Sequence, residues 1–342
     1  MIRVAVDLLG GDHAPDAVVR GAQLAQQADP GVQVILVGPV DVAQPLLAGT
    51  ADTCRLFPAS QVVEMDEDPA RAVRAKRDAT VRVAAQLIRD GDADAMVSVG
   101  STGAALTAAV VVLRRLPGMS RPALAVVVPA RAGPLVLLDA GATAQGDVDR
   151  LVQYALVGAA YAQVCLGVDD PRVGLLNLGE EAGKGDQLRK EAFAALSALP
   201  LRFVGNVEGC DIPHGGRADV VVTDGFTGNV LLKGLEGAAS MLGEVLHDAF
   251  LSTPERRAAA QVLLPAMAEA TARLSAEHLG GGVLLGVNGV VVVGHGAAGP
   301  RAVASCISVA AQAVRERLVP RLTGALAQLV DRRRHLAASG TR

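Results

Sequence analysis

Short apolar runs recur along the chain, and each of them ends near a glycine or an aspartate. Eight such runs are rich in valine and do not alternate with polar residues, which is typical of strands buried on both faces of a sheet. They are VAVDLLGG, VQVILVG, DAMVSVGSTG, ALAVVVP, LVLLDAG, RVGLLNLGEE, ADVVVTDGFTG and VVVVGHG. Helical spacing follows several of them, as at residues 16–28, 78–91 and 147–163. The alternation predicts a three-layer α/β/α sandwich with a mostly parallel sheet.

This pattern covers residues 1–330, which we interpret as a single catalytic α/β domain with two lobes around a cleft. Residues 240–282 interrupt the alternation and predict a helical hairpin insertion, because Pro254 and Pro265 stand where helices begin or break. Residues 331–342 are expected to form a solvated C-terminal tail.

The hairpin carries an apolar cluster that we expect at an exposed tip, made of Val262, Leu263 and Leu264. One interpretation is an ordinary hairpin that packs on the body or on a second subunit. The other is a contact with a membrane or a partner, to which Arg256 and Arg257 would add positive charge.

Composition narrows the functional classes. The formal net charge is −3, aromatic residues make up 2% and tryptophan is absent, which argues against a nucleic-acid partner. The four cysteines form no C-x-x-C pair, which excludes a zinc ribbon and a thioredoxin motif. Scattered cysteines, together with a first strand that leaves no room for an export signal, predict a cytoplasmic protein. No run approaches the ~20 apolar residues that a membrane-spanning helix needs.

Polar, glycine-rich turns follow the predicted strands, and ligands of open α/β sheets bind beyond the carboxyl ends of strands. We therefore expect these turns to gather main-chain N–H donors on one rim of the sheet. The turns are Asp7 with residues 10–13, then 100–104, 139–143, 177–185, 223–234 and 294–299. The adjacent Gly10 and Gly11 do not have the G-x-G-x-x-G spacing of a dinucleotide site, but their amides can still face a phosphate.

Few side chains in these turns offer acid–base or cationic chemistry. Lys184 is one of four lysines and lies between two glycines, where it either binds an anion or pairs with a nearby glutamate. His13 and His295 lie in glycine turns and act either as acid or base or as braces of the turn. No metal-binding cluster and no G-x-S-x-G elbow is present in the sequence.

The order of these motifs resembles the bacterial phosphate acyltransferase family PlsX, from the first strand to about residue 318. The residues that carry the resemblance are AVDLLGGDHAP, SVGSTGA, LLDAGA, LLNLGEEAGKG, DVVVTDGFTGNVLLKGLEG and LLGVNGVVVVGHG. Ser101 and Thr143 stand where that family usually has asparagine. The resemblance implies the fold of the isocitrate dehydrogenase and phosphotransacetylase group and a homodimer.

The resemblance also implies a reaction in which inorganic phosphate displaces acyl carrier protein from a long-chain acyl thioester. The acyl phosphate formed would be used by a membrane glycerol-3-phosphate acyltransferase in phospholipid synthesis, without a cofactor or a metal. Phosphate is already a nucleophile and a thiolate leaves readily, so positioning and oxyanion stabilisation would suffice.

On this reading we predict catalytic roles for Lys184, Asn229, His13 and Asp224. Lys184 would neutralise the phosphate or the tetrahedral oxyanion, Asn229 would hold the carbonyl oxygen, and Asp224 would orient its turn. His13 would hold the protonation state of the phosphate or only brace its turn. The predicted substrate- and phosphate-binding set is Gly10, Gly11, Asp12, Ser101, Thr102, Gly103, Gly179, Thr227, Gly228 and His295.

Three alternatives remain open at this stage. A nicotinamide-dependent dehydrogenase on the same fold would need a dinucleotide fingerprint, which the sequence lacks. A non-enzymatic scaffold would use the hairpin to tether a partner to a membrane. A phosphotransacetylase would act on acetyl-coenzyme A and need a small acyl pocket.

Overall fold

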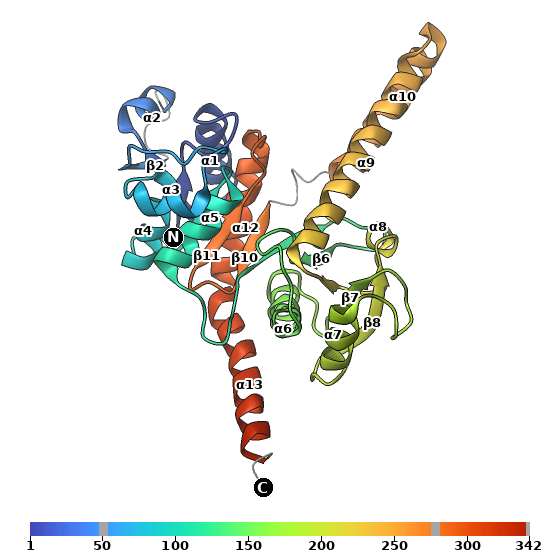
Figure 1. The fold of residues 1–342 in the computed structure, drawn as a ribbon. Coiled ribbons are helices and arrows are strands. Elements are labelled where there is room, and N and C mark those ends of the chain that lie inside the picture. Colours follow the sequence, from blue (N-terminus) through green and yellow to red (C-terminus); the bar gives the residue numbers. More distant parts are fainter. Residues whose placement is uncertain (48–53, 275–280, 340–342) are drawn as a thin grey trace.

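The computed structural model describes residues 1–47, 54–274 and 281–339, and its two lobes share one continuous sheet (Figure 1). The sheet has 11 strands in the order β3-β2-β1-β4-β11-β10-β5-β6-β9-β7-β8. The predicted mostly parallel α/β fold is confirmed, and all eight predicted strands are present. Three strands were not predicted, namely β3 (Cys54–Pro58), β8 (Arg202–Glu208) and β10 (Gly282–Leu285).

The first lobe contains five strands that all run in the same direction. They are β3, β2 (Val32–Gly38), β1 (Ile2–Asp7), β4 (Ala95–Ser98) and β11 (Val290–Val293). Alternate side chains of β1 enter different cores, because Val4 and Val6 pack with helices α1 (Asp16–Ala28) and α12 (Pro300–Arg315), whereas Ala5 packs with α4 (Thr80–Asp90). The helices α2 (Val40–Leu46), α3 (Pro69–Ala75) and α5 (Thr102–Ala108), which η1 (Ala109–Leu113) extends, complete this lobe.

The strands of the second lobe run in the opposite direction, except for β5 (Ala123–Val128). Strand β10 is antiparallel to β11 and to β5, and β5 is antiparallel to β6 (Leu135–Leu138). Beyond that point the sheet is parallel again, through β6, β9 (Val220–Val222), β7 (Arg172–Asn177) and β8. Helices α6 (Val148–Cys165), α7 (Gln187–Ser197) and α8 (Asp211–His214) belong to this lobe.

This reversal corrects the expectation of a single rim of glycine turns. The turns after β1, β4 and β11 leave one edge of the sheet, and the turns after β6, β7 and β9 leave the other. Three successive antiparallel pairings between the two groups, β11–β10, β10–β5 and β5–β6, are the cause, because an odd number of reversals leaves β6 opposite in direction to β11. The candidate site is therefore built from two groups of turns, one on each lobe.

A long helical hairpin projects from the second lobe (Figure 1). It consists of α9 (Gly225–Leu251) and α10 (Pro254–Leu274), so it begins well before residue 240, where the apolar pattern first changes. The tip lies between Leu251 and Pro254, and Val262 and Leu263 lie within α10 rather than at the tip. The side chain of Leu264 lies outside the described residues, and Pro265 is inside α10.

The C-terminal segment also differs from the expectation of a solvated tail. Helix α13 runs from Leu318 to Ser339, so most of residues 331–342 are helical. Within the described ranges, no helix combines the length and the apolar character needed to cross a bilayer.

The packing of α1 on α12 yields a stability prediction. A Cβ at Gly21 would lie 2.5 Å from Val303 Cβ and 2.7 Å from the Pro300 carbonyl oxygen. We expect Gly21→Ala to force the two helices apart and to lower the free energy of unfolding by about 1–3 kcal/mol. The matched control is Gly324→Ala in α13, where a Cβ has nothing within 4 Å and helix propensity improves by up to about 1 kcal/mol. Urea unfolding measures the free energy of unfolding of both variants. Equal changes in the two would contradict the close packing of α1 on α12 at Gly21.

Candidate active site

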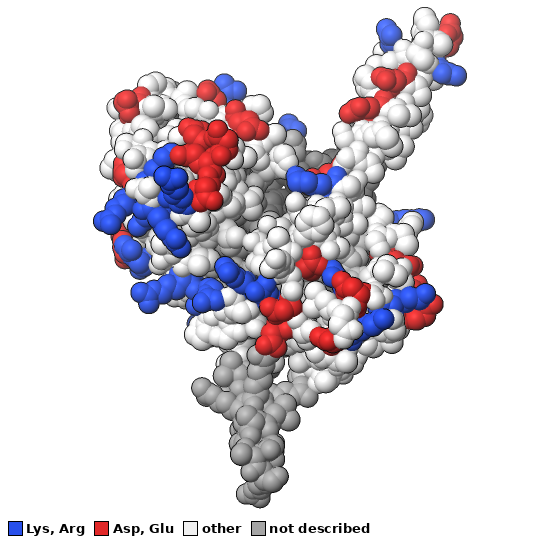
Figure 2. Space-filling view, in the orientation of Figure 1, with Lys and Arg blue, Asp and Glu red and all other residues white. Residues whose placement is uncertain are grey.

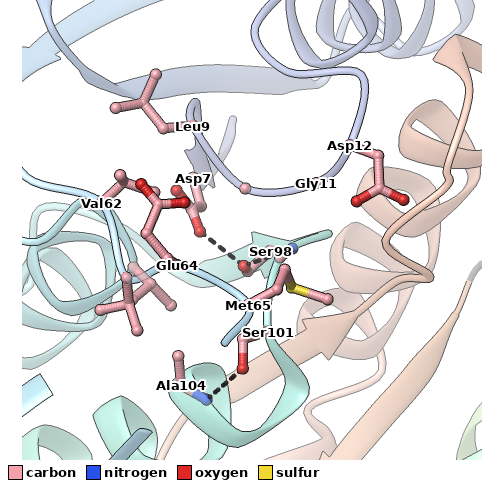
Figure 3. Close-up of a pocket in the computed structure, with 14 residues that line it drawn as sticks. Asp7, Leu9, Gly11, Asp12, Val62, Glu64, Met65, Ser98, Ser101 and Ala104 are labelled. Atoms are coloured by element: carbon pink, nitrogen blue, oxygen red, sulfur yellow. Dashed lines mark hydrogen bonds between the residues drawn. The ribbon is translucent and has the colours of Figure 1, made fainter. Parts of the chain in front are cut away.

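The turns of the first lobe enclose a cavity of about 210 Å³ at the ends of β1 and β4 (Figure 3). Its lining combines main chain from the glycine turns with side chains from the segment 62–65 and from α5. The lining residues are Asp7, Leu9, Gly10, Gly11, Asp12, Val62, Val63, Glu64, Met65, Val81, Ser98, Gly100, Ser101 and Ala104.

Asp7 lies beneath this cavity and is only 4% exposed. The Ser98 hydroxyl donates a hydrogen bond of 2.7 Å to Asp7 Oδ2, and the Gly100 amide donates to the Ser98 hydroxyl at 3.2 Å. Burial raises the pKa of the Asp7 carboxyl, although the hydroxyls of Thr80 and Ser98 and nearby amides oppose the shift. A Cβ at Gly10 would lie 2.7 Å from Asp7 Oδ2, so only glycine allows the main chain to pass this close.

The structure brings several predicted binding residues to this cavity. Gly10, Gly11, Asp12 and Ser101 line it, and the Asp12 amide donates to the Gly296 carbonyl at 2.8 Å, which ties the first turn to the turn after β11. The Ser101 side chain caps α5 by accepting from the Ala104 amide at 3.4 Å. Thr102 and Gly103 form the first turn of α5 but are not part of the lining.

The two histidines of the first lobe have exposed side chains outside the cavity lining. His295 Nδ1 accepts a hydrogen bond of 3.2 Å from the Ala297 amide, which braces its own turn. The main-chain oxygen of His13 accepts from the Ala17 amide at 3.0 Å, at the start of α1.

The second lobe is organised around Asp139, a fully buried carboxylate directly after β6. Its Oδ1 accepts hydrogen bonds from the amides of Leu124, Gly141 and Ala142, and its Oδ2 accepts from the Thr143 amide, all at 2.8–3.0 Å. Burial raises the pKa of Asp139, and these four amides oppose the rise. The carboxylate thereby fixes the turn 139–143.

Helix α9 begins beside that turn. Asp224 is its N-cap and accepts from the Thr227 amide at 2.9 Å, as the sequence predicts for a residue that orients the turn. Arg189 of α7 pairs with Asp224 Oδ2 and donates to the Thr227 hydroxyl at 3.1 Å. Burial alone would raise the pKa of Asp224, but Thr227 and Arg189 outweigh it and hold the pKa below its usual range.

The remaining predicted residues of this lobe surround the start of α9. A Cβ at Gly141 would lie 3.5 Å from Asn229 Oδ1, which places that amide against the turn of Asp139. A Cβ at Gly228 would lie 1.9 Å from the Asp139 carbonyl oxygen, so the start of α9 packs directly on the same turn.

Lys184 lies on an exposed loop after β7. Its ammonium is 3.8 Å from Glu181 Oε2, and its carbonyl oxygen accepts from the Asn177 amide group at 3.1 Å. A Cβ at the buried Gly179 would lie 3.0 Å from Lys184 Cγ, so this glycine makes room for the lysine stem. Neither Lys184 nor Asn229 lines the first-lobe cavity.

The residues around the first-lobe cavity and those at the start of α9 nevertheless border the same face of the sheet. Ala104 of α5 and Ala140 belong to one hydrophobic cluster, against which Ala142 and Leu232 of α9 also pack. Figure 2 shows the surface recessed between the first lobe and the base of α9. The start of α9 therefore lies on the same side of the molecule as the helices that close the first-lobe cavity.

Three residues of the candidate site, namely Arg189, Asp139 and Glu64, were not identified from the sequence. Arg189 carried no signal, because an arginine three residues after Asp186 reads as an ordinary helix-surface pair. Asp139 was visible in the turn DAGAT, where an aspartate two residues before a glycine favours a side-chain-capped turn. Glu64 reaches the cavity only because the segment 62–65 folds over it.

Among the described residues, no three or more His, Cys, Asp or Glu side chains are grouped so that they could hold a metal ion. Burial raises the pKa values of Cys165 and Cys306 to about 12, which keeps both as unreactive thiols near neutral pH.

Comparison with known proteins identifies a family. A family model described as "Fatty acid synthesis protein" matches residues 2–321. A curated protein named "Phosphate acyltransferase" from Desulfitobacterium hafniense (strain Y51) is 43% identical over 317 residues, which cover 92% of this chain and 94% of the relative. A protein of the same name from Acidobacterium capsulatum is 45% identical over 313 residues, which cover 90% and 92% of the two chains.

Solved structures share the fold at much lower identity. A phosphotransacetylase from Streptococcus pyogenes superposes with a TM-score of 0.60 at 18% identity and covers 92% of this chain and 94% of its own. A branched-chain phosphotransacylase from Enterococcus faecalis V583 gives a TM-score of 0.58 at 16% identity, over 92% and 99% of the two chains. These likenesses establish the fold.

The buried pair of Asp224 and Arg189 yields a prediction of stability with pH. Asp224→Asn keeps a good N-cap but leaves Arg189 without its buried carboxylate, so we expect a loss of about 1–3 kcal/mol of unfolding free energy at pH 7. Because the folded pKa of Asp224 is lowered, its contribution is present above the unfolded value of about 4 and disappears as the pH falls through the folded value. Urea unfolding from pH 7 downward measures this.

The matched control is Asp186→Asn. Asp186 is also an N-cap and also pairs with Arg189, but its side chain is 59% exposed against 8% for Asp224. We expect a change within about 0.5 kcal/mol for the control. Equal losses in the two variants would show that burial of the pair contributes nothing.

Proposed function

The chain belongs to the family of fatty acid synthesis proteins whose curated relatives are phosphate acyltransferases, and from that premise we propose how this enzyme acts. It is a phosphate acyltransferase, and we propose that it moves a long-chain acyl group from an acyl carrier protein thioester to inorganic phosphate. The products are an acyl phosphate and free acyl carrier protein. One observation carries the proposal. The cavity lined by the glycine turns and the capped start of α9 lie on the same face of the sheet.

The phosphate is assigned to the first-lobe cavity. Its supporting features are the closely packed Gly10 and Gly11 turn, the Ser101 hydroxyl and the size of the cavity, about 210 Å³. Glycine turns of this kind let main-chain amides approach an oxyanion without side-chain interference. The cavity thus holds the nucleophile in place before the acyl group arrives.

The thioester carbonyl is assigned to the start of α9. Asn229 is the fifth residue of that helix and lies next to the turn that Asp139 fixes, and its amide group can donate to a carbonyl oxygen. Lys184 is a cation on the glycine-flanked loop after β7, and we assign it to neutralise the tetrahedral oxyanion. Its weak 3.8 Å pairing with Glu181 leaves the ammonium available for this role.

The chemistry then needs no covalent enzyme intermediate. A phosphate oxygen attacks the carbonyl carbon, the tetrahedral oxyanion is held by Asn229 and Lys184, and the C–S bond breaks as the carbonyl reforms. The sulfur leaves as a thiolate, because a thiol of ordinary pKa, about 8.5, needs little help from a general acid. The rate enhancement comes from positioning and from donors fixed before the reaction begins.

Mass spectrometry tests the reaction directly. Palmitoyl carrier-protein thioester with phosphate should give acyl phosphate, and Lys184→Ala should lower kcat/KM by about 10²–10³-fold without lowering the melting temperature. Lys190→Ala is the control, because Lys190 is an exposed lysine of α7 outside the proposed site. Free fatty acid as the sole product would indicate a thioesterase, and turnover only with acetyl-coenzyme A would indicate a phosphotransacetylase. Either result would contradict the proposal.

We further propose that the hairpin forms a homodimer and contacts the cytoplasmic face of the membrane, where a glycerol-3-phosphate acyltransferase would consume the product. Exposed apolar side chains of α9 recur at helical spacing at Phe226, Val230, Met241 and Val245. A lone hairpin with such a stripe needs a covering surface, for which a second copy is the simplest source. On α10, Val262 is 79% exposed and Leu263 is 54% exposed, and these two are assigned to lipid.

Two double variants separate these assignments. Met241→Glu with Val245→Glu should convert the dimer to a monomer in light scattering, because charges cannot be buried between subunits. Val262→Glu with Leu263→Glu should leave the dimer intact but weaken flotation with phosphatidylglycerol vesicles by at least about tenfold, since inserted apolar area is replaced by negative charge. Each variant is the control for the other. A dimer that survives the first pair, or vesicle binding that survives the second, would refute the corresponding assignment.

A further inference from the structure

The buried Asp7 carboxyl belongs to the lining of the first-lobe cavity, and one of its oxygens has no hydrogen-bond partner among the described residues. Its Oδ2 accepts from the Ser98 hydroxyl at 2.7 Å, whereas its Oδ1 has no hydrogen-bond partner among the described residues. Asp7 lines the cavity, and Figure 3 shows its carboxyl group between Ser98 and the segment that carries Glu64. A buried polar atom without a partner is costly, so a ligand in this cavity is the natural partner for Oδ1.

The charges around the cavity limit what that ligand can be. The lining contains the carboxyl groups of Asp7, Asp12 and Glu64 and no lysine, arginine or histidine. Thr80 of α4 and Ser98 of β4 offer only neutral hydroxyls to Asp7. A fully ionised Asp7 would repel an oxyanion that has no proton of its own, because nothing in the lining offsets the two negative charges.

We propose that Asp7 Oδ1 and the bound phosphate share one proton, and that Asp7 thereby selects protonated oxyanions over sulfate. The inference rests on the proposed function, in which phosphate occupies this cavity. Phosphate keeps a P–OH group at neutral pH and donates it to an ionised Asp7. Sulfate carries the same shape without a proton, so it binds only when Asp7 itself is protonated. Arsenate keeps a proton at neutral pH as phosphate does, so it should bind as phosphate does.

The shared proton has a defined pH signature. Above the pKa of Asp7, sulfate must take up a proton from solution in order to bind, so its affinity falls by about tenfold per pH unit. Phosphate and arsenate supply the proton themselves, so their affinities change little in the same range. The pKa of Asp7 is raised by burial, which brings this divergence toward neutral pH. Asp12 and Glu64 are exposed carboxyl groups at the rim of the cavity, and their negative charge acts on all three anions.

Isothermal titration calorimetry with phosphate, arsenate and sulfate from pH 6 to pH 9 tests the inference. At pH 8 we expect the wild type to prefer phosphate and arsenate over sulfate by at least about tenfold. Asp7→Asn replaces the carboxyl by an amide that donates to any of the three anions, so the preference should fall to about threefold or less and lose its pH dependence. Asp66→Asn is the control for loss of one negative charge, because Asp66 is exposed and outside the cavity lining.

The outcomes are distinguishable from failure of the proposed function, because acyl phosphate formation is measured separately on the same wild-type protein. Equal binding of sulfate and phosphate at pH 8 would overturn the role of Asp7 and leave the acyltransferase reaction untouched. An unchanged preference in a folded Asp7→Asn variant would also overturn it. If that variant does not fold, the wild-type pH series alone decides, since parallel pH profiles for sulfate and phosphate contradict a shared proton.

Discussion

The structure depends on two buried carboxyl groups, one at the end of a strand in each lobe. Asp139 accepts four main-chain amides, three on Oδ1 and one on Oδ2, and so fixes its own turn. Asp7 Oδ2 accepts from the Ser98 hydroxyl, and the buried Oδ1 has no hydrogen-bond partner among the described residues. The Asp139 carboxyl therefore fixes the main chain of the second lobe, whereas the Asp7 carboxyl of the first lobe keeps an oxygen that a ligand can use. The fixed turn supports the start of α9, and the open carboxyl lies where the nucleophile is proposed to bind.

The three antiparallel pairings β11–β10, β10–β5 and β5–β6 make this division possible, because together they reverse the direction of the later strands. In a purely parallel sheet all the glycine turns would leave one edge, and a single row of donors would serve both substrates. Here the turns after β1, β4 and β11 form one group, and those after β6, β7 and β9 form another. Under the proposed function this arrangement is useful, because each lobe would prepare one reactant and the reactants would meet in the recess between the lobes.

The apolar pattern predicted the eight strands that are buried on both faces, and it predicted the hairpin, because buried strands and breaks in periodicity are local signals. It missed β8, whose residues are mostly only half-buried, and β3, an edge strand with exposed residues such as Phe57. The sequence did not predict the reversal of strand direction between the lobes. Strand direction depends on long-range pairings such as those of β10 and β5, and not on the residues within each strand. Among site residues, Gly10, Ser101 and Asp224 could be found from turn chemistry. Arg189 could not, since its partner Asp224 lies in another element 35 residues away.

Carbon-13 NMR of protein labelled at the aspartate carboxyl carbons tests the central claim most directly. Titration with inorganic phosphate should shift the Asp7 carboxyl resonance, because its oxygen gains a partner and a share of a proton. The Asp139 resonance should stay in place, because Asp139 does not line the cavity and is held by four main-chain amides. An Asp7 resonance that does not move while phosphate saturates the enzyme would contradict the account.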